Sequence, residues 1–207
     1  IVVRNAWYPM FENVKVSGMY GPAGERNPLQ EALLLEDCYS PLIDKCYVWG
    51  AQDGLVYRGE AKQPEDGIIR DSYFVGCRRG VTVRLTPGTE RWEEPAFHMS
   101  TCHVNYLDEG LTLEGVRQVQ IRDCLFYCHD MGGALIGSTG PARDYEPTDI
   151  DLRYASDVVI GGTIFAEPSN PRRIAVRIGK DSGYVMLRDN QFNHQGTAVR
   201  NESPLQS

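Results

Sequence analysis

Short apolar runs recur along the whole chain, with the alternation of β-strands and almost no helical spacing. One pattern reads apolar, any residue, apolar, two polar or small residues, one small residue, any residue, apolar. Seven copies of it can be laid over one another. We call the second apolar residue of the pattern the leading core position. In the seven copies it is Phe11, Ile43, Ile69, Met99, Ile121, Ile160 and Leu187.

Two further columns accompany the leading position. Three residues after it the residues are mostly small: Val14, Cys46, Ser72, Cys102, Cys124, Thr163 and Asn190. Five residues after it they are apolar in every copy: Val16, Val48, Phe74, Val104, Phe126, Phe165 and Phe192. We expect this last column to lie in the core.

A second type of strand accompanies each copy, usually announced by a glycine that we expect in a tight turn with positive φ: Gly54, Gly80, Gly110, Gly132 and Gly196. The strand windows are 1–4, 33–36, 55–58, 81–84, 111–114, 133–136, 174–177 and 197–200. Their first and third positions are mostly apolar, so the second and fourth should face outward.

Successive copies are 22 to 39 residues apart, which fits a basic turn of three short strands with insertions at fixed corners. Such a unit buries its apolar side only by stacking on its neighbours, about 4.8 Å away. The pattern therefore predicts an all-β solenoid of about seven rungs, with residues 1–207 as one domain. A β-sandwich is the alternative, but it does not explain the aligned columns.

The segments 119–126 and 185–192 carry a resemblance to a known family. Both resemble the strand, tight turn, strand corner of the right-handed parallel β-helix family, which includes pectate lyases, polygalacturonases and phage tailspike depolymerases. The family often stacks Asn at this corner, whereas here only Asn190 does so. The resemblance implies a right-handed, single-stranded parallel β-helix and says little about chemistry.

The composition excludes several classes of protein. The 207 residues include 21 Lys and Arg against 28 Asp and Glu, and a net charge of −7 disfavours nucleic acid as a partner. No apolar run is long enough to span a bilayer. The six cysteines are too sparse for a disulfide scaffold and lack zinc-ligand spacing, so no metal site is predicted.

The chain also resembles an excised piece of a longer one, since it begins inside an apolar run without a Met. The resemblance implies a helical cap on the first rung, which the sequence lacks. We therefore expect flanking domains at both ends or a homotrimer of the tailspike type, located outside the cell or on a virion.

The resemblance places a substrate groove along the second strand type. Its outward fourth positions are Arg4, Glu36, Arg58, Arg84, Glu114, Ile136, Arg177 and Arg200. Arginine binds carboxylates and sulfates with paired donors, so this column predicts a track for an anionic glycan, with Arg58, Arg84, Arg177 and Arg200 as ligands. The alternative is a solvated face on which Arg84 pairs with Glu114 one rung away.

Two long loops, 85–96 and 137–157, should overhang this groove. The first carries Trp92 and Glu93, and the second carries Asp144 and Tyr145. An aromatic ring stacks on a sugar face while nearby acids take its hydroxyl groups, so these four residues are candidate sugar ligands. Trp92 could equally anchor its loop to the coil.

Glycoside hydrolysis needs two carboxyl groups about 5 to 9.5 Å apart. Asp108 and Asp130 each stand nine residues after a leading position, one rung apart, and Glu114 lies close by on the sheet. These three are the candidate catalytic acids, although Asp108 and Asp130 are equally suited to forming turns. His129 and His194 are candidate proton shuttles or structural residues.

Three functions stay open at this stage. The first is binding and cleavage of an extended anionic polysaccharide by a glycoside hydrolase. The second is a non-catalytic structural or adhesive stalk. The third is a uronate lyase or epimerase, in which the resemblance implies an Arg base such as Arg84 or Arg177; only this function would call for Ca²⁺, and no carboxylate cluster demands it.

Overall fold

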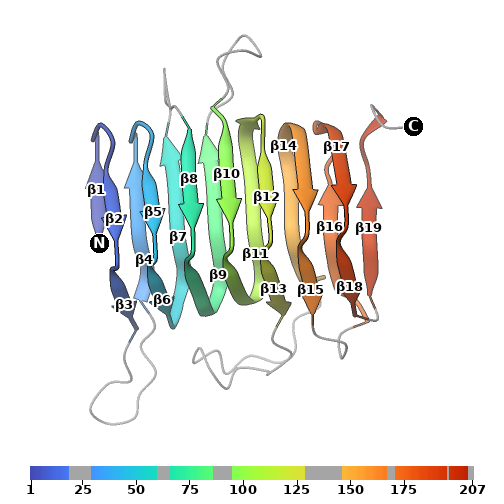
Figure 1. Ribbon diagram of the computed structural model, residues 1–207, viewed down its shortest axis with the longest axis horizontal. Helices are drawn as coiled ribbons and strands as arrows, with labels where there is room; N and C mark the ends of the chain where they lie inside the picture. The colour runs from blue at the N-terminus through green and yellow to red at the C-terminus, as the bar shows by residue number, and fades with distance from the viewer. Residues whose placement is uncertain are drawn as a thin grey trace.

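The computed structural model of the chain describes residues 1–18, 29–59, 66–85, 95–128, 146–166, 171–194 and 196–204. These ranges hold 19 β-strands in one continuous hydrogen-bonded sheet. Every strand pairing between them is parallel, and the chain winds around one long axis with its termini at opposite ends (Figure 1). The all-β parallel β-helix is thereby confirmed, whereas the hand of the coil and the number of its rungs stay predictions.

The coil has three faces, which we name by their side chains. The charged face holds the second strand type. It consists of β1 (Val2–Arg4), β4 (Leu29–Glu36), β7 (Ala51–Gly59), the C-terminal parts of β9 (Tyr73–Leu85) and β11 (His103–Arg117), the N-terminal part of β14 (Thr148–Gly161), β16 (Ile174–Ile178) and β19 (Thr197–Asn201).

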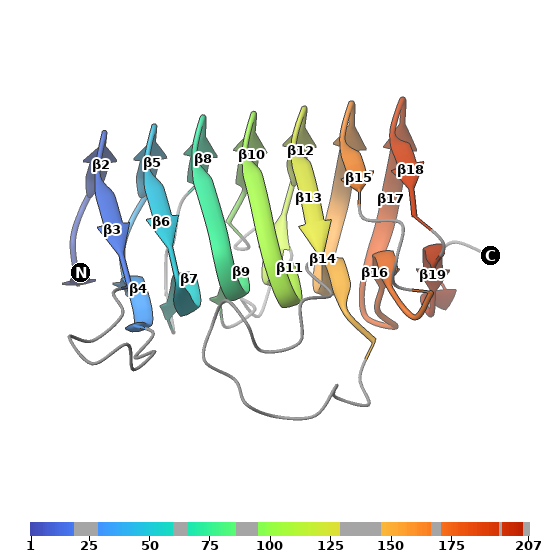
Figure 2. The same ribbon diagram turned by 90° about the horizontal axis from the view of Figure 1, so that it is seen from below.

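The leading face holds the leading core position. It consists of β2 (Met10–Glu12), β5 (Leu42–Asp44), β8 (Gly67–Arg70), β10 (Phe97–Ser100), β12 (Gln120–Arg122), the C-terminal part of β14 and β17 (Gly183–Arg188). The aromatic face, seen in Figure 2, consists of β3 (Lys15–Ser17), β6 (Tyr47–Trp49), the N-terminal parts of β9 and β11, β13 (Leu125–Cys128), β15 (Ile164–Ala166) and β18 (Gln191–Asn193).

Both predicted core columns are confirmed in full register. The leading column pairs from Phe11 to Leu187 on consecutive strands without a slip. The column from Val16 to Phe192 pairs in the same way. Its last three members are stacked phenylalanine rings, with centroids 5.8 and 5.0 Å apart. The apolar interior of the coil is built from these stacks.

A tight turn joins the leading face to the aromatic face in every repeat. The residue at this turn has positive φ each time: Asn13, Lys45, Asp71, Thr101, Asp123, Gly162 and Asp189. In most repeats the following small residue closes the turn with its side chain. The Ser72 hydroxyl donates to the Arg70 carbonyl at 2.7 Å, and the Cys102 and Cys124 thiols donate to carbonyls two residues back at 3.1 and 3.2 Å. The Asn190 amide instead donates to a carbonyl of the neighbouring rung, Ile160 O, at 2.9 Å.

The predicted role of the recurring glycines is wrong for three of them. Gly54, Gly80 and Gly110 lie inside strands and have no positive φ. They are needed because adjacent turns of the chain approach too closely for a side chain. A Cβ on Gly80 would lie 2.5 Å from Gly110 O and 2.4 Å from a Val104 methyl.

The extent of the second long loop is also wrong, because residues 148–157 belong to β14. The strand window predicted at 133–136 lies outside the described residues. Leu111 pairs instead with Ile150, which pairs with Val176 and through it with Val199. The first position of the predicted window in β16 is thus Val176 in place of Ile174, a shift of two residues in register. Both side chains are buried, and a period of two cannot distinguish registers that differ by two residues.

Candidate functional site

The outer surface of the charged face carries the predicted arginine column over its first five strands. Arg4, Glu36, Arg58, Arg84 and Glu114 are direct neighbours on β1, β4, β7, β9 and β11. The next neighbour of Glu114 is Tyr154, after an irregularity in register. This part of the predicted column is confirmed.

Arg177 and Arg200 do not belong to that column. Arg177 pairs with Asp151, which pairs with Thr112, so both arginines lie two residues away from the predicted line. The misplacement follows from the register of β16, since a shift of two residues leaves a side chain on the same face. The charged surface therefore has no continuous row of arginines from end to end of the described sheet.

Each predicted glycan-binding arginine already contacts a carboxylate. Arg58 lies 3.1 Å from Glu36 and 3.5 Å from Glu31, and Arg84 lies 3.2 Å from Glu114. Arg177 bonds Glu202 at 3.1 and 3.3 Å, and Arg200 makes two bonds to Glu146, one of them at 2.9 Å. The alternative interpretation of the column, in which Arg84 pairs with Glu114 one rung away, is confirmed.

These pairs set the electrostatics of the face. The hydrogen bond from Arg58, together with the charges of Arg4 and Arg58, lowers the pKa of Glu36, and the bond from Arg200 lowers the pKa of Glu146. Both acids are therefore anions at neutral pH, and they offset the arginines beside them. The arginines that an anionic glycan would need are thus partly neutralised by carboxylates of the same face.

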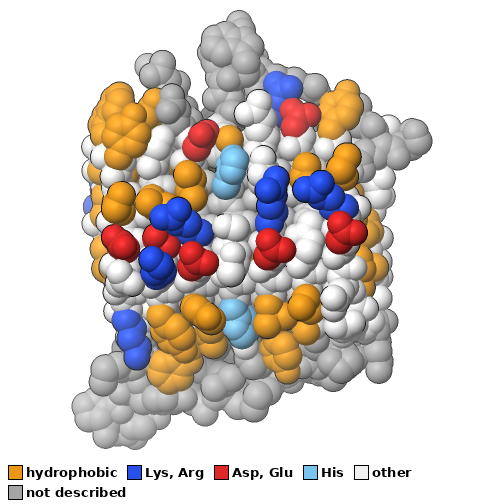
Figure 3. Space-filling model, viewed as in Figure 1, with side chains coloured by type: hydrophobic (Ala, Val, Ile, Leu, Met, Phe, Trp, Pro, Cys, Tyr) orange, Lys and Arg blue, Asp and Glu red, His pale blue; other side chains and the backbone are white. Residues whose placement is uncertain are grey.

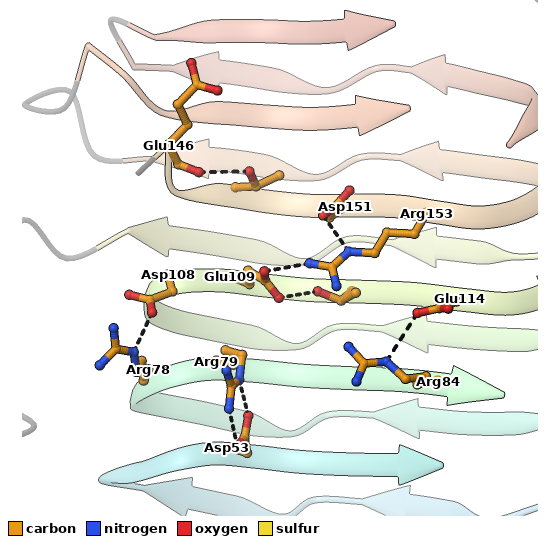
Figure 4. A network of polar contacts seen from close by, with 12 residues as sticks. Asp53, Arg78, Arg79, Arg84, Asp108, Glu109, Glu114, Glu146, Asp151 and Arg153 are labelled. Atoms are coloured by element: carbon orange, nitrogen blue, oxygen red, sulfur yellow. Dashed lines mark hydrogen bonds and ion pairs between the residues drawn. The ribbon is translucent and has the colours of Figure 1, made fainter. Parts of the chain in front are cut away.

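The candidate acids are not brought together. Asp108 contacts Arg78, and Glu114 contacts Arg84, at opposite ends of the same segment of β11 (Figure 4). Six residues of extended strand separate them by up to about 20 Å, well beyond the reach of a hydrolytic pair. Asp130, the third candidate acid, lies outside the described residues.

A second charged column runs parallel to the first, five residues earlier in each strand, and sequence reasoning missed it. Glu31, Asp53, Arg79 and Glu109 are neighbours in register, and Arg79 bonds Asp53 at 2.7 Å. The signal was present in the constant offset of five residues before Glu36, Arg58, Arg84 and Glu114. It was overlooked because the predicted windows began two residues too late to include it.

Arg153 extends from β14 over β11 and joins the second column to Asp151. Its guanidinium bonds Glu109 at 2.6 Å and Asp151 at 2.9 Å, and the Thr112 hydroxyl donates to the other oxygen of Glu109 at 2.8 Å (Figure 4). Glu109 and Asp151 are thus the acids that the structure holds around one cation. Their sequence positions carried no recognisable motif.

A fully buried ion pair lies beneath the corner between the charged and aromatic faces. Arg173 and Asp149 have side chains that are 0% exposed, and the Arg173 Nε donates to Asp149 at 2.9 Å. The Tyr106 hydroxyl donates to the same carboxylate. Burial raises the pKa of Asp149 to about 6, and the attraction of Arg173 partly offsets this rise. The group is closed to ligands, so its role is structural.

The remaining predicted ligands are only partly placed. Trp92, Glu93, Asp144, Tyr145 and His129 lie outside the described residues. His194 accepts a hydrogen bond from the Gly196 backbone N–H at 3.0 Å, and burial together with the nearby charge of Arg173 lowers its pKa. A partly buried imidazole that closes a local turn is the structural alternative considered for this residue.

No cluster of three or more potential metal ligands occurs among the described residues. The charged face is also a poor cradle for Ca²⁺, because Glu109 and Asp151 are already bound to Arg153. In the same described part of the chain, no helix combines the length and apolar character needed to cross a bilayer.

The fold is shared with two solved structures of a surface adhesin, PfbA of Streptococcus pneumoniae. One aligns over 96% of this chain and 62% of its own length, with a TM-score of 0.55 and 11% sequence identity. The other aligns over 97% of this chain and 68% of its own length, with a TM-score of 0.54 and 13% identity. At such low identity the likeness concerns the fold only.

Searches by sequence add nothing to this likeness. No protein-family model matches the chain, and no curated protein matches it. The chain spans less than two thirds of the length of the first adhesin structure.

Proposed function

We propose that the chain is a non-catalytic β-helical module of an extracellular or surface protein, whose rigid coil presents binding surfaces. The observation that carries this proposal is the occupation of the charged face by its own ion pairs. The predicted arginine ligands and the candidate acids Asp108 and Glu114 all contact an opposite charge from another strand or segment.

The shape of the site supports the same conclusion. Hydrolysis needs two carboxyl groups on opposite sides of one bond, and Asp108 and Glu114 are too far apart for this. The ion pairs fasten each strand to the next, as in Arg84–Glu114 and Arg79–Asp53. Such a ladder favours a stiff rod over a reactive cleft.

The structural neighbours support an adhesive role and an extracellular location, because both are described as surface adhesins. Nothing in them favours a virion. Polysaccharide as the partner and a homotrimer as the assembly stay predictions, and sedimentation of the purified chain would determine the latter.

The test is incubation with capsular, O-antigen and uronate polysaccharides, followed by size-exclusion chromatography. We expect the chain lengths to stay unchanged, for the wild type and for Glu114→Gln alike. Shortening by the wild type that disappears in the variant would overturn the proposal and establish a hydrolase. A new near-ultraviolet absorbance from an unsaturated product would establish a lyase instead.

A second candidate function is glycan cleavage at Glu109 and Asp151. It is favoured by one observation, namely that these acids come from adjacent strands and share the guanidinium of Arg153. Asp151→Asn should then abolish any shortening seen in the same assay, while Asp108→Asn should leave it intact.

A further inference from the structure

The outer side of the aromatic face differs from the other two faces in chemistry. Two columns of side chains point outward there, on either side of the buried column from Val16 to Phe192. The first column is Lys15, Tyr47, Tyr73, His103, Leu125, Ile164 and Gln191. The second is Ser17, Trp49, Val75, Asn105, Tyr127, Ala166 and Asn193, with an irregularity in register between Val75 and Asn105. Among these described positions the one Asp, Glu, Lys or Arg is Lys15, at one end.

Charges are frequent on the neighbouring surface. The leading face presents a column with Glu12, Asp44, Arg70, Arg122 and Arg188. Figure 3 shows a band of acidic and basic side chains across the middle of that surface and a belt of hydrophobic side chains below it. The uncharged aromatic surface is therefore a local feature, in a chain of which 24% is charged.

The aromatic side chains of the first column form a continuous row across the strands. The ring centroids of Tyr47 and Tyr73 are 5.9 Å apart, and those of Tyr73 and His103 are 6.0 Å apart. Tyr47 is 37% exposed and Tyr73 is 47% exposed, so the row is open to a ligand. Its repeat is comparable with the length of one sugar unit in an extended glycan.

Asn105 supplies a second, independent observation on the same face. It follows His103 by two residues on β11, so both side chains point outward. Asn105 is only 8% exposed, and its amide oxygen has no hydrogen-bond partner among the described residues. A buried acceptor without a donor costs free energy, and a ligand hydroxyl group would satisfy it.

His103 fits the uncharged character of the surface. Its imidazole is half-buried beside Tyr73, and burial lowers its pKa. The ring is therefore neutral at physiological pH, when it offers one donor and one acceptor to hydroxyl groups.

The size of the face argues against a protein partner. Seven strands about 4.8 Å apart, each with three residues on this face, span about 34 by 10 Å, or roughly 340 Å². A stable protein interface buries about 800 Å² on each partner. A strip of this size instead matches one extended oligosaccharide, whose sugar faces stack on aromatic rings and whose hydroxyl groups reach amide and imidazole groups.

We infer that the aromatic face is a binding site for an uncharged oligosaccharide, which stacks along Tyr47 and Tyr73 and donates a hydroxyl hydrogen bond to Asn105. This inference deepens the proposed function, on which it rests for the non-catalytic role. It assigns the ligand to the aromatic face, whereas the sequence had pointed to an anionic glycan on the charged face.

The experiment is isothermal titration calorimetry of the whole chain with maltohexaose, cellohexaose, mannohexaose and chitohexaose, with hexagalacturonate as the anionic counterpart. We expect binding to at least one neutral hexasaccharide. Tyr73→Ala should weaken it at least about ten-fold, which is about 1.4 kcal/mol, while Tyr73→Phe should keep most of the affinity.

Two control variants distinguish binding at this site from nonspecific binding to other exposed aromatic or charged side chains. Tyr8→Ala removes a ring that is 63% exposed but packs against Trp7 and Tyr39, away from the aromatic face. Arg84→Ala removes a charge from the charged face. Both should bind like the wild type.

Asn105→Leu tests the polar contact. It should lower the affinity while leaving the melting temperature unchanged or higher, because it removes an unsatisfied buried acceptor. A purely structural Asn105 would instead lower the melting temperature.

The inference is overturned by any of three results: binding of none of the neutral sugars, binding of hexagalacturonate that depends on Arg84, or a dimer in solution that Tyr73→Ala dissociates. The first two leave the proposed non-catalytic role standing. Shortening of glycans in the cleavage assay would overturn that role without deciding which face binds, so the two failures are distinguishable.

Discussion

At the scale of single residues, the largely apolar interior of the described coil includes the charged pair Arg173 and Asp149. Arg173 and Asp149 are both fully buried and bonded to each other, and Arg173 also donates to the Phe126 carbonyl at 3.2 Å. Each charge is tolerated only because the other is present. The pair fastens β14 to the segment before β16.

Arg173→Met should destabilise the chain by about 3–5 kcal/mol at pH 7, because it leaves Asp149 buried without a cation. Urea denaturation measures this loss. The double variant Asp149→Leu with Arg173→Met should recover most of it, since neither charge then needs a partner. A double variant as unstable as the single one would contradict this account.

Lowering the pH should restore part of the stability that Arg173→Met loses. Burial already raises the pKa of Asp149 to about 6 in the folded chain, above its ordinary value of 3.8. A carboxyl group whose folded pKa is raised lowers stability as pH rises through that range, and removal of Arg173 strengthens the effect. When the pH is lowered from 7 to 5, the free energy of unfolding of Arg173→Met should therefore rise more than that of the wild type. An equal change in the two proteins would contradict the argument.

At the scale of elements, close contact between strands decides the role of the glycines. Gly54, Gly80 and Gly110 lie under one another where the aromatic face turns into the charged face. Their conformation is open to any residue, but backbone atoms of the next strand occupy the place of a Cβ. Strand spacing, and not turn geometry, selects glycine here.

Gly80→Ala should cost about 1–3 kcal/mol, because its Cβ would overlap Gly110 O and a Val104 methyl group. Gly67→Ala is the matched control. Its Cβ would meet only ring atoms of Phe97 and Tyr57 at 3.3 Å, and we expect a smaller loss. Equal midpoints for the two variants in thermal unfolding would show that the stacking of the glycines is unimportant.

At the scale of the whole molecule, the coil is a one-dimensional stack in which each turn depends on its neighbours. A substitution at the same core position should therefore destabilise the chain more in the middle of the stack than at its end. Ile121 is 0% exposed between Met99 and Ile160, whereas Leu187 has a described neighbour on one side and is only half-buried.

Ile121→Asp should unfold the chain, since a charge would enter the stacked core at a cost of several kcal/mol. Leu187→Asp should leave most of the coil folded, and only the last strands should unfold. Circular dichroism and limited proteolysis would distinguish the two outcomes. A well-folded Ile121→Asp variant would contradict the observed register.

The sequence by itself determined the β-helix and its core. Stacked turns place equivalent residues of successive repeats above one another, so the periodicity of Phe11 to Leu187 and of Val16 to Phe192 is visible in one dimension. The first five members of the arginine column followed from the same alternation.

Only the tertiary structure decided how the side chains on the surfaces are paired. The register of β16 was ambiguous by two residues, because inward positions recur every second residue, and this displaced Arg177 and Arg200 from their predicted column. Whether an arginine is free for a ligand or paired within the chain depends on the neighbouring strand, as Arg84 and Glu114 show. The outward row of Tyr47, Tyr73 and His103 likewise exists only once β6, β9 and β11 are side by side.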